Sequence, residues 1–336
     1  MKRKIILGLL LAVVLIVAFI AWKFLGPTLH APEKKYFYIP TGQNFEGVKT
    51  DLKQQKIMSG SIWFGWASKI IRYEKVKPGR YEIKKGMSLV SLVRMLKNGQ
   101  QSPVNFVITK LRTKESLASR IGNSFECDST QMMRFLNNAD SLKEYDFDTS
   151  TVMAIAMPFT YTIKWNTTPQ AIFQHFNTAY KNFWTDERKQ KATNLGLTPV
   201  QVSTLASIIE EETNSKTDKP NVASVYLNRM AKGMPLQADP TVKFALRDFG
   251  IKRVLRGHLD TPSPYNTYIN KGLPPGPICT PAVETIDAVL NSPKTDYIYF
   301  VANSAFDGTH IFTTNYTEHM KYAKLYQQEL NKRNIK

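Results

Sequence analysis

A run of apolar residues without a charge follows the first four positions of the chain. It covers residues 5–22, and Phe24 and Leu25 extend it beyond Lys23. A helix of about 20 apolar residues is long enough to cross the hydrocarbon core of a bilayer. The pattern therefore predicts a single transmembrane anchor over residues 5–25.

The flanks of this run predict its orientation. Residues 2–4 are all basic, and positive residues tend to stay on the cytoplasmic side of a membrane. We expect a cytoplasmic tail over residues 1–4 and everything after the anchor outside the cell membrane. A cleaved signal peptide is the alternative, but the bulky and charged residues at 22–24 follow Ala21, which makes a poor cleavage site.

Beyond a proline-containing tether at 26–35, short strands alternate with amphipathic helices. A strand, a turn and a helix follow one another over residues 36–52 and again over 80–99, with a weaker third copy at 104–121. Units of this size are typical of a small α+β module. We expect such a module over residues 36–121 and an α+β fold for the chain as a whole.

Three aromatic residues, Trp63, Phe64 and Trp66, lie between the first two copies. Aromatic rings can stack on sugar rings, but the same side chains also serve in a core or beside a membrane. The pattern favours core or membrane-proximal packing and leaves sugar stacking as the alternative.

The rest of the chain, residues 122–336, has the pattern of a larger mixed α/β domain. A stretch at 263–281 is rich in Pro, Gly, Asn and Tyr, which predicts a shaped loop, and such loops often carry function. The regular elements expected are helices at 168–184, 198–212, 222–232 and 315–331 and strands at 297–302 and 310–313.

The helix that ends in three glutamates has the clearest boundaries. Thr198 fits the N-cap, Pro199 the first turn, and Gln201 the return bond of a capping box. Apolar residues then form one stripe that runs into Glu210–Glu212. An apolar wall beside a carboxyl group raises its pKa toward the range useful for general acid catalysis. A frayed acidic helix end is the alternative interpretation.

The three glutamates differ in their expected positions. At about 100° per residue, Glu211 points away from the apolar stripe and should be solvated, while Glu212 lies on the stripe. Glu210 lies on a flank of small residues that would leave room for a ligand, namely Ser203, Ala206 and Ser207. Periodicity alone does not choose between Glu210 and Glu212 as the functional acid.

Charge narrows the choice of partner. The 336 residues include 45 Lys and Arg against 27 Asp and Glu, which gives a net charge of +18. Such a balance suggests nucleic acid, acidic lipid or a carboxylate-bearing polymer as partner. Zinc-finger spacing and RNA-binding aromatic signatures are absent, so we expect no nucleic acid. Cys127 and Cys279 are too few for a disulfide framework, and whether they pair stays open.

Familiar catalytic signatures are absent from the sequence. It has no H-E-x-x-H metal site, phosphate loop, dinucleotide fingerprint or G-x-S-x-G elbow. Among five histidines, only His310 and His319 are near each other, so we expect neither a metal nor a cofactor. Carboxylates, aromatic rings and amides remain, and these are the groups of a site that cleaves a sugar polymer.

Several motifs stand in a fixed order along the second domain. They are LASIIEEET at 205–213, LQADPTV at 236–242, YNTY at 265–268, GLPPGPI at 272–278, and YFVAN at 299–303 with GTHIF at 308–312. Together they resemble the endolytic murein transglycosylase family, also called YceG-like. That family also carries an N-terminal anchor and a LysM-like module. The resemblance therefore implies that residues 36–121 are LysM-like and that 122–336 form a YceG-like catalytic domain.

The resemblance also implies roles for individual residues. Glu210 matches the family's catalytic glutamate, and Glu212 matches a second acid that supports or replaces it. The positions that match the substrate cleft are Gln237, Asp239, Tyr265, Asn266, Thr267 and Tyr268, and more loosely Asn303 and His310.

The implied reaction is the non-hydrolytic cleavage of nascent peptidoglycan. The family cleaves the β-1,4 bond between N-acetylmuramic acid and N-acetylglucosamine and leaves a 1,6-anhydro end, which would terminate strand elongation. The implied partners are glycan strands, membrane lipid, and peptidoglycan synthases of the elongation or division machinery. The protein would then be a single-pass protein of the bacterial inner membrane with a periplasmic catalytic domain.

One segment departs from the family pattern. Met153 and Ala154 stand where Glu-Gly is common, and Phe159 replaces an acid. This puts any supporting role of those acids in doubt for this chain.

Two other functions stay open on the sequence. One is a hydrolytic muramidase, with Glu210 as the acid and Asp239 as the second carboxylate. The other is a non-catalytic scaffold that binds the cell wall.

Overall fold

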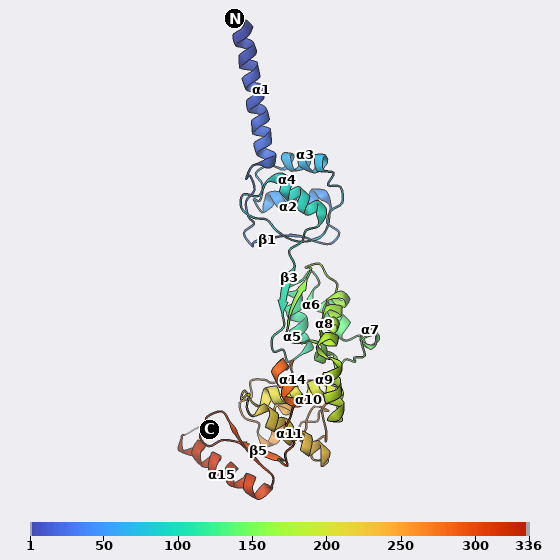
Figure 1. Ribbon diagram of the computed structural model, residues 1–336, viewed down its shortest axis with the longest axis vertical. Helices are drawn as coiled ribbons and strands as arrows, with labels where there is room; N and C mark the ends of the chain where they lie inside the picture. The colour runs from blue at the N-terminus through green and yellow to red at the C-terminus, as the bar shows by residue number, and fades with distance from the viewer. Residues whose placement is uncertain (1, 334–336) are drawn as a thin grey trace. The chain divides into compact units, whose positions relative to one another are not determined.

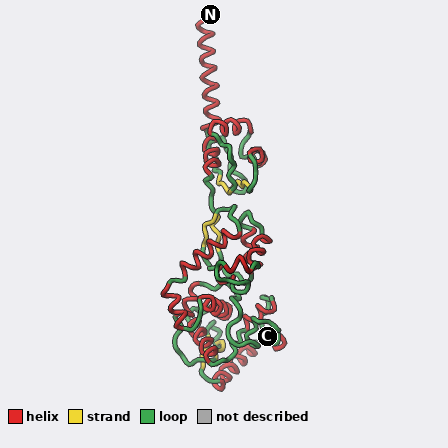
Figure 2. The backbone as a smooth tube through the Cα atoms, turned by 90° about the vertical axis from the view of Figure 1, so that its right-hand side faces the viewer, coloured by secondary structure: helices red, strands yellow, loops and turns green. Residues whose placement is uncertain are grey.

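A computed structural model describes residues 2–333, and their contacts form two compact units (Figure 1). Most of the chain is helix or loop, and the strands are short (Figure 2). The first unit holds the described residues up to 106 with 124–127 and 162–168, and the second holds 107–123, 128–161 and the described residues from 169 onward. The two units are thus not divided at a single point of the chain.

The first unit begins with helix α1 (Lys2–Leu25). Residues Arg3–Leu25 are long and apolar enough to cross a membrane. Most of the apolar side chains of α1, from Ile5 onward, are exposed. The predicted N-terminal apolar helix is therefore present.

A small sheet and three helices follow in the first unit. Strands β1 (Tyr36–Ile39) and β2 (Gly79–Glu82) pair antiparallel, with Phe37 opposite Tyr81 in the core. Both predicted strands are confirmed to within one residue. The helices are α2 (Phe45–Gln54), α3 (Ser61–Ile71) and α4 (Leu89–Asn98), which share one hydrophobic core with the sheet.

Helix α3 is not among the predicted helices, because exposed apolar residues blur its amphipathic pattern. Phe64 is fully buried in the core, whereas Trp66 is 54% exposed. Trp63 packs edge-on against Phe24 of α1, with ring centroids 6.0 Å apart. Core packing is confirmed for Phe64, which has no exposed face to offer a sugar.

The second unit is mainly helical. Strands β3 (Val104–Val107) and β4 (Thr160–Ile163) pair with each other, and each has residues assigned to both units. The next elements are α5 (Lys114–Gly122), α6 (Ser129–Leu136), α7 (Ala139–Lys143), a 3-10 turn η1 (Val152–Ile155) and α8 (Pro169–Phe183). The predicted helix at 168–184 is confirmed as α8.

The remaining elements complete the second unit. They are α9 (Asp186–Asn194), α10 (Pro199–Glu212), α11 (Lys219–Ala231), α12 (Asp239–Leu246), α13 (Arg256–Leu259), α14 (Val283–Leu290), β5 (Tyr299–Ala302), β6 (His310–Thr313) and α15 (Tyr316–Lys332). The antiparallel pair β5–β6 and the helices α10, α11 and α15 are confirmed. Helices α9, α12, α13 and α14 are additions to the predicted set.

Helix α10 runs through the core of the second unit. Its predicted capping box is present: Thr198 accepts from the Gln201 backbone N–H, and Gln201 accepts from that of Thr198. All eight residues from Val202 to Ile209 are buried, and the helix contacts α9, α11, α12, α14 and η1. Over these residues the helix is therefore buried nearly all round, as a core helix is.

One expectation and one alternative interpretation for this helix are wrong. The small-residue flank is not open to a ligand, because Ser203, Ala206 and Ser207 are all buried, and Ser207 Oγ accepts from the Ile278 N–H at 3.0 Å. The C-terminal end is not frayed, because Thr213 is buried and its N–H donates to the carbonyl of Ile209 at 3.1 Å.

Candidate active site

The last turn of α10 places its three glutamates in three different environments. Glu210 is held by an ion pair. The Lys219 ammonium lies 2.8 Å from Glu210 Oε2, and the Thr285 hydroxyl donates to the same oxygen. Lys219 also donates to Thr285 Oγ1 at 2.7 Å. The side chains of Glu210 and Lys219 are only 16% and 9% exposed, so this triangle ties α10 to α11 and α14 inside the fold.

Glu211 is bound by two basic residues from the segment before α5. Arg112 donates from Nε and Nη2 to the two carboxylate oxygens at 3.0 and 2.9 Å, and Lys110 Nζ lies 2.9 Å from Oε1. Burial acts to raise the pKa of Glu211, but the hydrogen bonds from Arg112 and Lys110 outweigh it and lower that pKa. The expectation that Glu211 is solvated is therefore wrong.

Among the three glutamates, Glu212 is the one without a neutralising contact within residues 2–333. Its Oε2 is sealed from solvent and has no hydrogen-bond partner in the described part of the chain. The pKa of Glu212 is raised to about 7, mainly by burial and also by the nearby charge of Asp239, against the opposing charges of Lys243 and Arg229. A carboxyl group with such a pKa can both donate and accept a proton near neutral pH.

Asp239 and Tyr268 form a hydrogen-bonded pair beside Glu212. The Tyr268 hydroxyl donates to Asp239 Oδ1 at 2.6 Å. Burial raises the pKa of Tyr268, and the bond to Asp239 and the charge of Glu212 act in the same direction. The structure thus brings three of the predicted site residues, Glu212, Asp239 and Tyr268, into one electrostatic cluster.

Arg229 of α11 is the cation of this cluster. It is buried, and it donates from Nε to the Ile298 carbonyl and from Nη1 to the Leu236 carbonyl, both at 2.7 Å. Burial lowers the pKa of Arg229, while nearby Tyr226 and Glu212 act to raise it. The guanidinium therefore fixes the backbone that leads into α12 and supplies positive charge near Glu212.

Two predicted cleft residues serve the backbone rather than an open face. Asn266 is fully buried and donates to the carbonyls of Leu259 and Thr261 at 2.8 and 2.9 Å. Thr267 is also buried, and its Oγ1 accepts from the Ala238 N–H at 3.0 Å. Both residues hold the loop that carries Tyr268.

Gln237 and Tyr265 lie nearer to solvent. Gln237 is exposed and has a left-handed backbone (φ 53°), with its N–H donating to the Thr267 carbonyl at 3.0 Å. Tyr265 is half-buried and packs on Phe244, with ring centroids 4.7 Å apart. Both remain candidates for substrate contact.

Asn303 and His310 engage other groups. Asn303 hydrogen-bonds within the β5–β6 turn, to Thr309 Oγ1 at 3.2 Å. His310 contacts Asp218, with Nδ1 3.0 Å and the backbone N 2.7 Å from Oδ2. Asp218 immediately precedes Lys219, the residue that pairs with Glu210.

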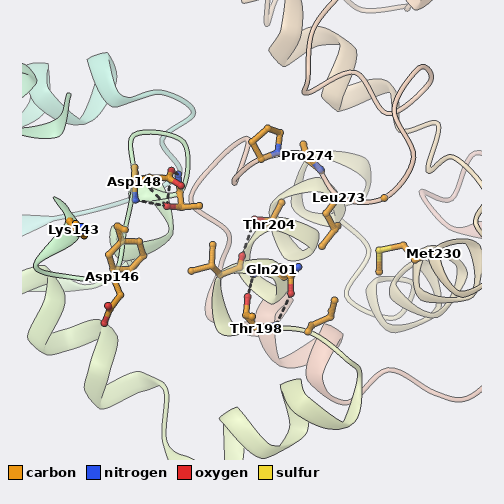
Figure 3. A pocket seen from close by; sticks show the side chains of 15 residues that line it. Lys143, Asp146, Asp148, Thr198, Gln201, Thr204, Met230, Leu273 and Pro274 are labelled. Atoms are coloured by element: carbon orange, nitrogen blue, oxygen red, sulfur yellow. Dashed lines mark hydrogen bonds between the residues drawn. The ribbon is translucent and has the colours of Figure 1, made fainter. Parts of the chain in front are cut away.

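The hollows in the second unit differ in size and place. A hollow of about 80 Å³ lies beside Glu211, between Arg112 and Lys243. The larger one, about 810 Å³, lies at the other end of α10, where Thr198 and Gln201 line it (Figure 3). Glu212 follows Gln201 by eleven positions, which is about 16 Å along a helix. The large hollow is therefore distinct from the glutamate cluster.

Metal ligands do not gather in the structure. Within residues 2–333, no group of three or more His, Cys, Asp or Glu side chains is placed to hold a metal ion. The Cys279 thiol is buried and donates to the Ser207 carbonyl at 3.4 Å, and burial raises its pKa.

Lys219 and Arg229 are site residues that the sequence reasoning missed. A signal existed for Arg229, because it stands three residues after Tyr226 on the apolar face of α11, where a charge needs partners. No comparable signal marked Lys219, whose partners come from two other helices.

The segment that departs from the family pattern is part of the core. Met153 and Ala154 are buried in η1, and Phe159 packs between Tyr161 and Phe183, with ring centroids 6.4 and 6.2 Å away. Apolar residues suit these positions, so the departures are consistent with local packing.

Known proteins resemble this chain over most of its length. The profile of the YceG-like family matches residues 37–325. The endolytic murein transglycosylase of Bacillus subtilis (strain 168) is 29% identical over 315 residues, which cover 88% of this chain and 85% of that protein. The protein of the same name from Streptococcus pneumoniae serotype 2 (strain D39) is 29% identical over 324 residues, 87% of this chain but only 58% of that longer protein.

A solved structure is similar as well. The 2.6 Å crystal structure of a YceG-like protein from Listeria monocytogenes aligns with a TM-score of 0.57 and 29% sequence identity. The alignment covers 85% of this chain and 98% of that one. Sequence and fold comparisons thus point to the same group of proteins.

Proposed function

Because the chain belongs to the YceG-like family, we propose that it is an endolytic peptidoglycan transglycosylase, the activity for which its relatives from Bacillus subtilis and Streptococcus pneumoniae are named. Its substrate would be the glycan strand of nascent peptidoglycan. It would cleave the β-1,4 bond between N-acetylmuramic acid and N-acetylglucosamine without consuming water.

The burial and the raised pKa of Glu212 are the observations that support a catalytic role. One oxygen of this carboxyl group is sealed from solvent and has no hydrogen-bond partner among the described residues. The group has a pKa of about 7 and lies near Asp239. Glu210 is instead occupied by Lys219 and Thr285. We therefore assign the general acid to Glu212 rather than to Glu210, which the sequence resemblance favours.

One carboxyl group can serve both halves of the reaction. Protonated Glu212 donates its proton to the glycosidic oxygen as the C1–O bond breaks, which frees the N-acetylglucosamine hydroxyl. The resulting carboxylate then accepts the proton of the muramic acid C6 hydroxyl as that oxygen bonds to C1. The proton returns to Glu212, and the product carries a 1,6-anhydro ring.

The neighbouring groups suit these steps. The negative charge of Asp239 raises the pKa of Glu212 in the resting site and would stabilise positive charge that develops at C1 in the transition state. Tyr268 fixes the Asp239 carboxylate through its 2.6 Å hydrogen bond. The exposed amide of Gln237 is available to sugar hydroxyl and acetamido groups.

The N-terminal helix supports a membrane location. We assign α1 as a single-pass anchor with residues 1–4 in the cytoplasm, because basic residues precede an apolar helix long enough to cross a bilayer. The module at 36–121, with two helices between paired strands, is proposed to be LysM-like and to bind wall glycan. Peptidoglycan synthases are the proposed protein partners.

A hydrolytic muramidase is the second candidate. The proximity of Glu212 and Asp239 favours it, because two carboxylates are the usual pair in glycoside hydrolysis. In that reaction, water rather than the C6 hydroxyl attacks C1. A non-catalytic scaffold is disfavoured, because wall binding alone does not require a carboxyl group with a raised pKa such as that of Glu212.

Mass spectrometry of the products tests this proposal. The full chain in detergent is incubated with uncrosslinked glycan strands, and the new ends are identified. Anhydro ends support the transglycosylase. Reducing ends, heavier by one water, would instead establish the muramidase, and binding without any release would establish the scaffold.

A further inference from the structure

Helix α3 has an apolar face that nothing in the described chain covers. Ile62, Trp66 and Ile70 are 63%, 54% and 71% exposed. They are spaced four residues apart, so they form one stripe along the helix. Gly65 leaves open space beside the stripe, because a Cβ atom there would meet nothing within 4 Å.

The opposite face of α3 is firmly packed. Phe64 and Ala67 are fully buried in the core of the module, and the Phe64 ring stacks on Phe45 of α2, with centroids 5.5 Å apart. The helix cannot turn its exposed stripe inward without removing these residues from the core. Its orientation, apolar side outward, is therefore fixed by the fold.

Helix α3 lies beside the last turns of α1. Trp63 packs edge-on against Phe19 and Phe24, with ring centroids 6.2 and 6.0 Å away, and α3 lies at that end of α1 in Figure 1. Phe19 precedes Leu25 by six residues, which is about 9 Å along the helix axis. Interfacial helices bury their apolar face to a depth of about 5–10 Å, so α3 lies at the depth of the membrane interface.

The polar residues of α3 match a lipid surface. The helix contains no acidic residue, and Lys69 and Arg72 are exposed at its C-terminal end. Trp side chains are enriched at the level of lipid head groups, and basic side chains are attracted to anionic lipids. An apolar stripe with one Trp and basic neighbours is the composition of an interfacial helix.

We propose that α3 is a second membrane contact, which lies in the outer head-group region with Ile62, Trp66 and Ile70 inserted toward the acyl chains. This rests on the proposed anchoring by α1. Two attachment points in place of one restrict the rotation of the module about α1 and hold it against the bilayer. In this proposal the lipid surface covers the exposed stripe of α3.

Site-specific labelling of the full chain tests this. Ile70→Cys carries an environment-sensitive fluorophore, Thr50→Cys on the exposed face of α2 is the matched control, and Val14→Cys reports on α1. The native Cys127 and Cys279 are buried and are disfavoured for labelling. The proteins are reconstituted in vesicles of phosphatidylcholine and phosphatidylglycerol that contain quenching lipids at defined depths.

We expect the label at position 70 to emit at shorter wavelength and to be quenched most by shallow quenchers, and the label at position 50 to stay in water. The label at position 14 should be quenched most by deep quenchers. If position 70 behaves like position 50 while position 14 is inserted, the interfacial contact is refuted and the anchor stands. Loss of quenching at both 14 and 70 refutes both.

A second measurement avoids the label. Brominated lipids quench tryptophan, and Trp66→Phe should remove part of this quenching. Trp165→Phe should not, because Trp165 packs on Tyr38 with ring centroids 4.9 Å apart. Equal quenching in wild type and Trp66→Phe would overturn the proposal.

Discussion

The ammonium of Lys219 lies 2.8 Å from the carboxylate of Glu210, and both side chains are largely buried. The same lysine contacts Thr285, whose hydroxyl also reaches Glu210. A carboxylate held in this way joins three helices, α10, α11 and α14. The geometry therefore places Glu210 and Glu212 in different environments, which periodicity alone could not distinguish.

Removing the partner of Glu210 should destabilise the fold. Lys219→Met leaves a largely buried carboxylate without its cation, and breaking such a pair costs about 3 kcal/mol or more. Chemical denaturation followed by the fluorescence of the buried Trp184 measures the change. Adding Glu210→Gln to Lys219→Met should restore part of the loss, and strictly additive effects of the two changes would contradict the ion pair.

The catalytic rate should depend on the protonation of Glu212. The acid form donates the proton, so kcat/KM should fall as pH rises through about 7, the pKa of this group, and approach a tenfold loss per pH unit above it. Initial rates of anhydro-end formation between pH 5 and 9 provide the profile. A rate that stays flat across pH 7 would show that Glu212 is not the acid.

Glu212→Gln should make the fold more stable than the wild-type fold as the pH rises through about 7. The folded pKa of about 7 lies above the ordinary 4.5, so the wild type loses up to about 3 kcal/mol as pH rises from 4.5 through 7. Glu212→Gln has no such loss, so it should gain stability relative to wild type over this range. Calorimetric scans at pH 5 and pH 8 measure the difference.

Glu211→Gln is the matched control for that measurement, with the opposite sign. The lowered pKa of Glu211 stabilises the fold above its ordinary pKa, and this stability is lost as pH falls. Glu211→Gln should therefore be less stable than wild type at both pH 5 and pH 8, with a smaller difference only below the ordinary pKa of 4.5. Parallel behaviour of the two variants would contradict the environments described above.

Tyr268→Phe should reduce activity while the fold stays intact. It removes the hydrogen bond to Asp239, and a hydrogen bond to a charged group is worth about 1.5 kcal/mol or more, which corresponds to a rate loss on the order of tenfold. Tyr81→Phe makes the same chemical change at a hydroxyl bonded to the Lys77 carbonyl in the first unit. Equal activity of the two variants would exclude a role for the Asp239–Tyr268 pair.

Local signals explain what the sequence could predict. The start of α10 is set by Thr198 and Gln201, which are three residues apart and bond to each other, so the boundary can be read from neighbours. The strands that begin at Tyr36 and His310 could likewise be predicted from short local runs of residues. The ordered motifs then indicated the family from the sequence alone.

Long-range contacts explain what the sequence could not predict. Glu211 is held by Arg112, 99 residues away, and Glu210 by Thr285, 75 residues away. Periodicity assumes one buried stripe, whereas α10 is buried nearly all round, so the expected solvation of Glu211 was wrong. The choice between the glutamates depends on such partners rather than on their angle around the helix.

The most direct test compares Glu212→Gln with Glu210→Gln in the full chain acting on uncrosslinked glycan strands. We predict that Glu212→Gln lowers the release of anhydro-ended fragments by on the order of a hundredfold or more, while Glu210→Gln retains activity in proportion to its folded fraction. Abolished release in a folded Glu210→Gln protein, with near-normal release from Glu212→Gln, would contradict this account.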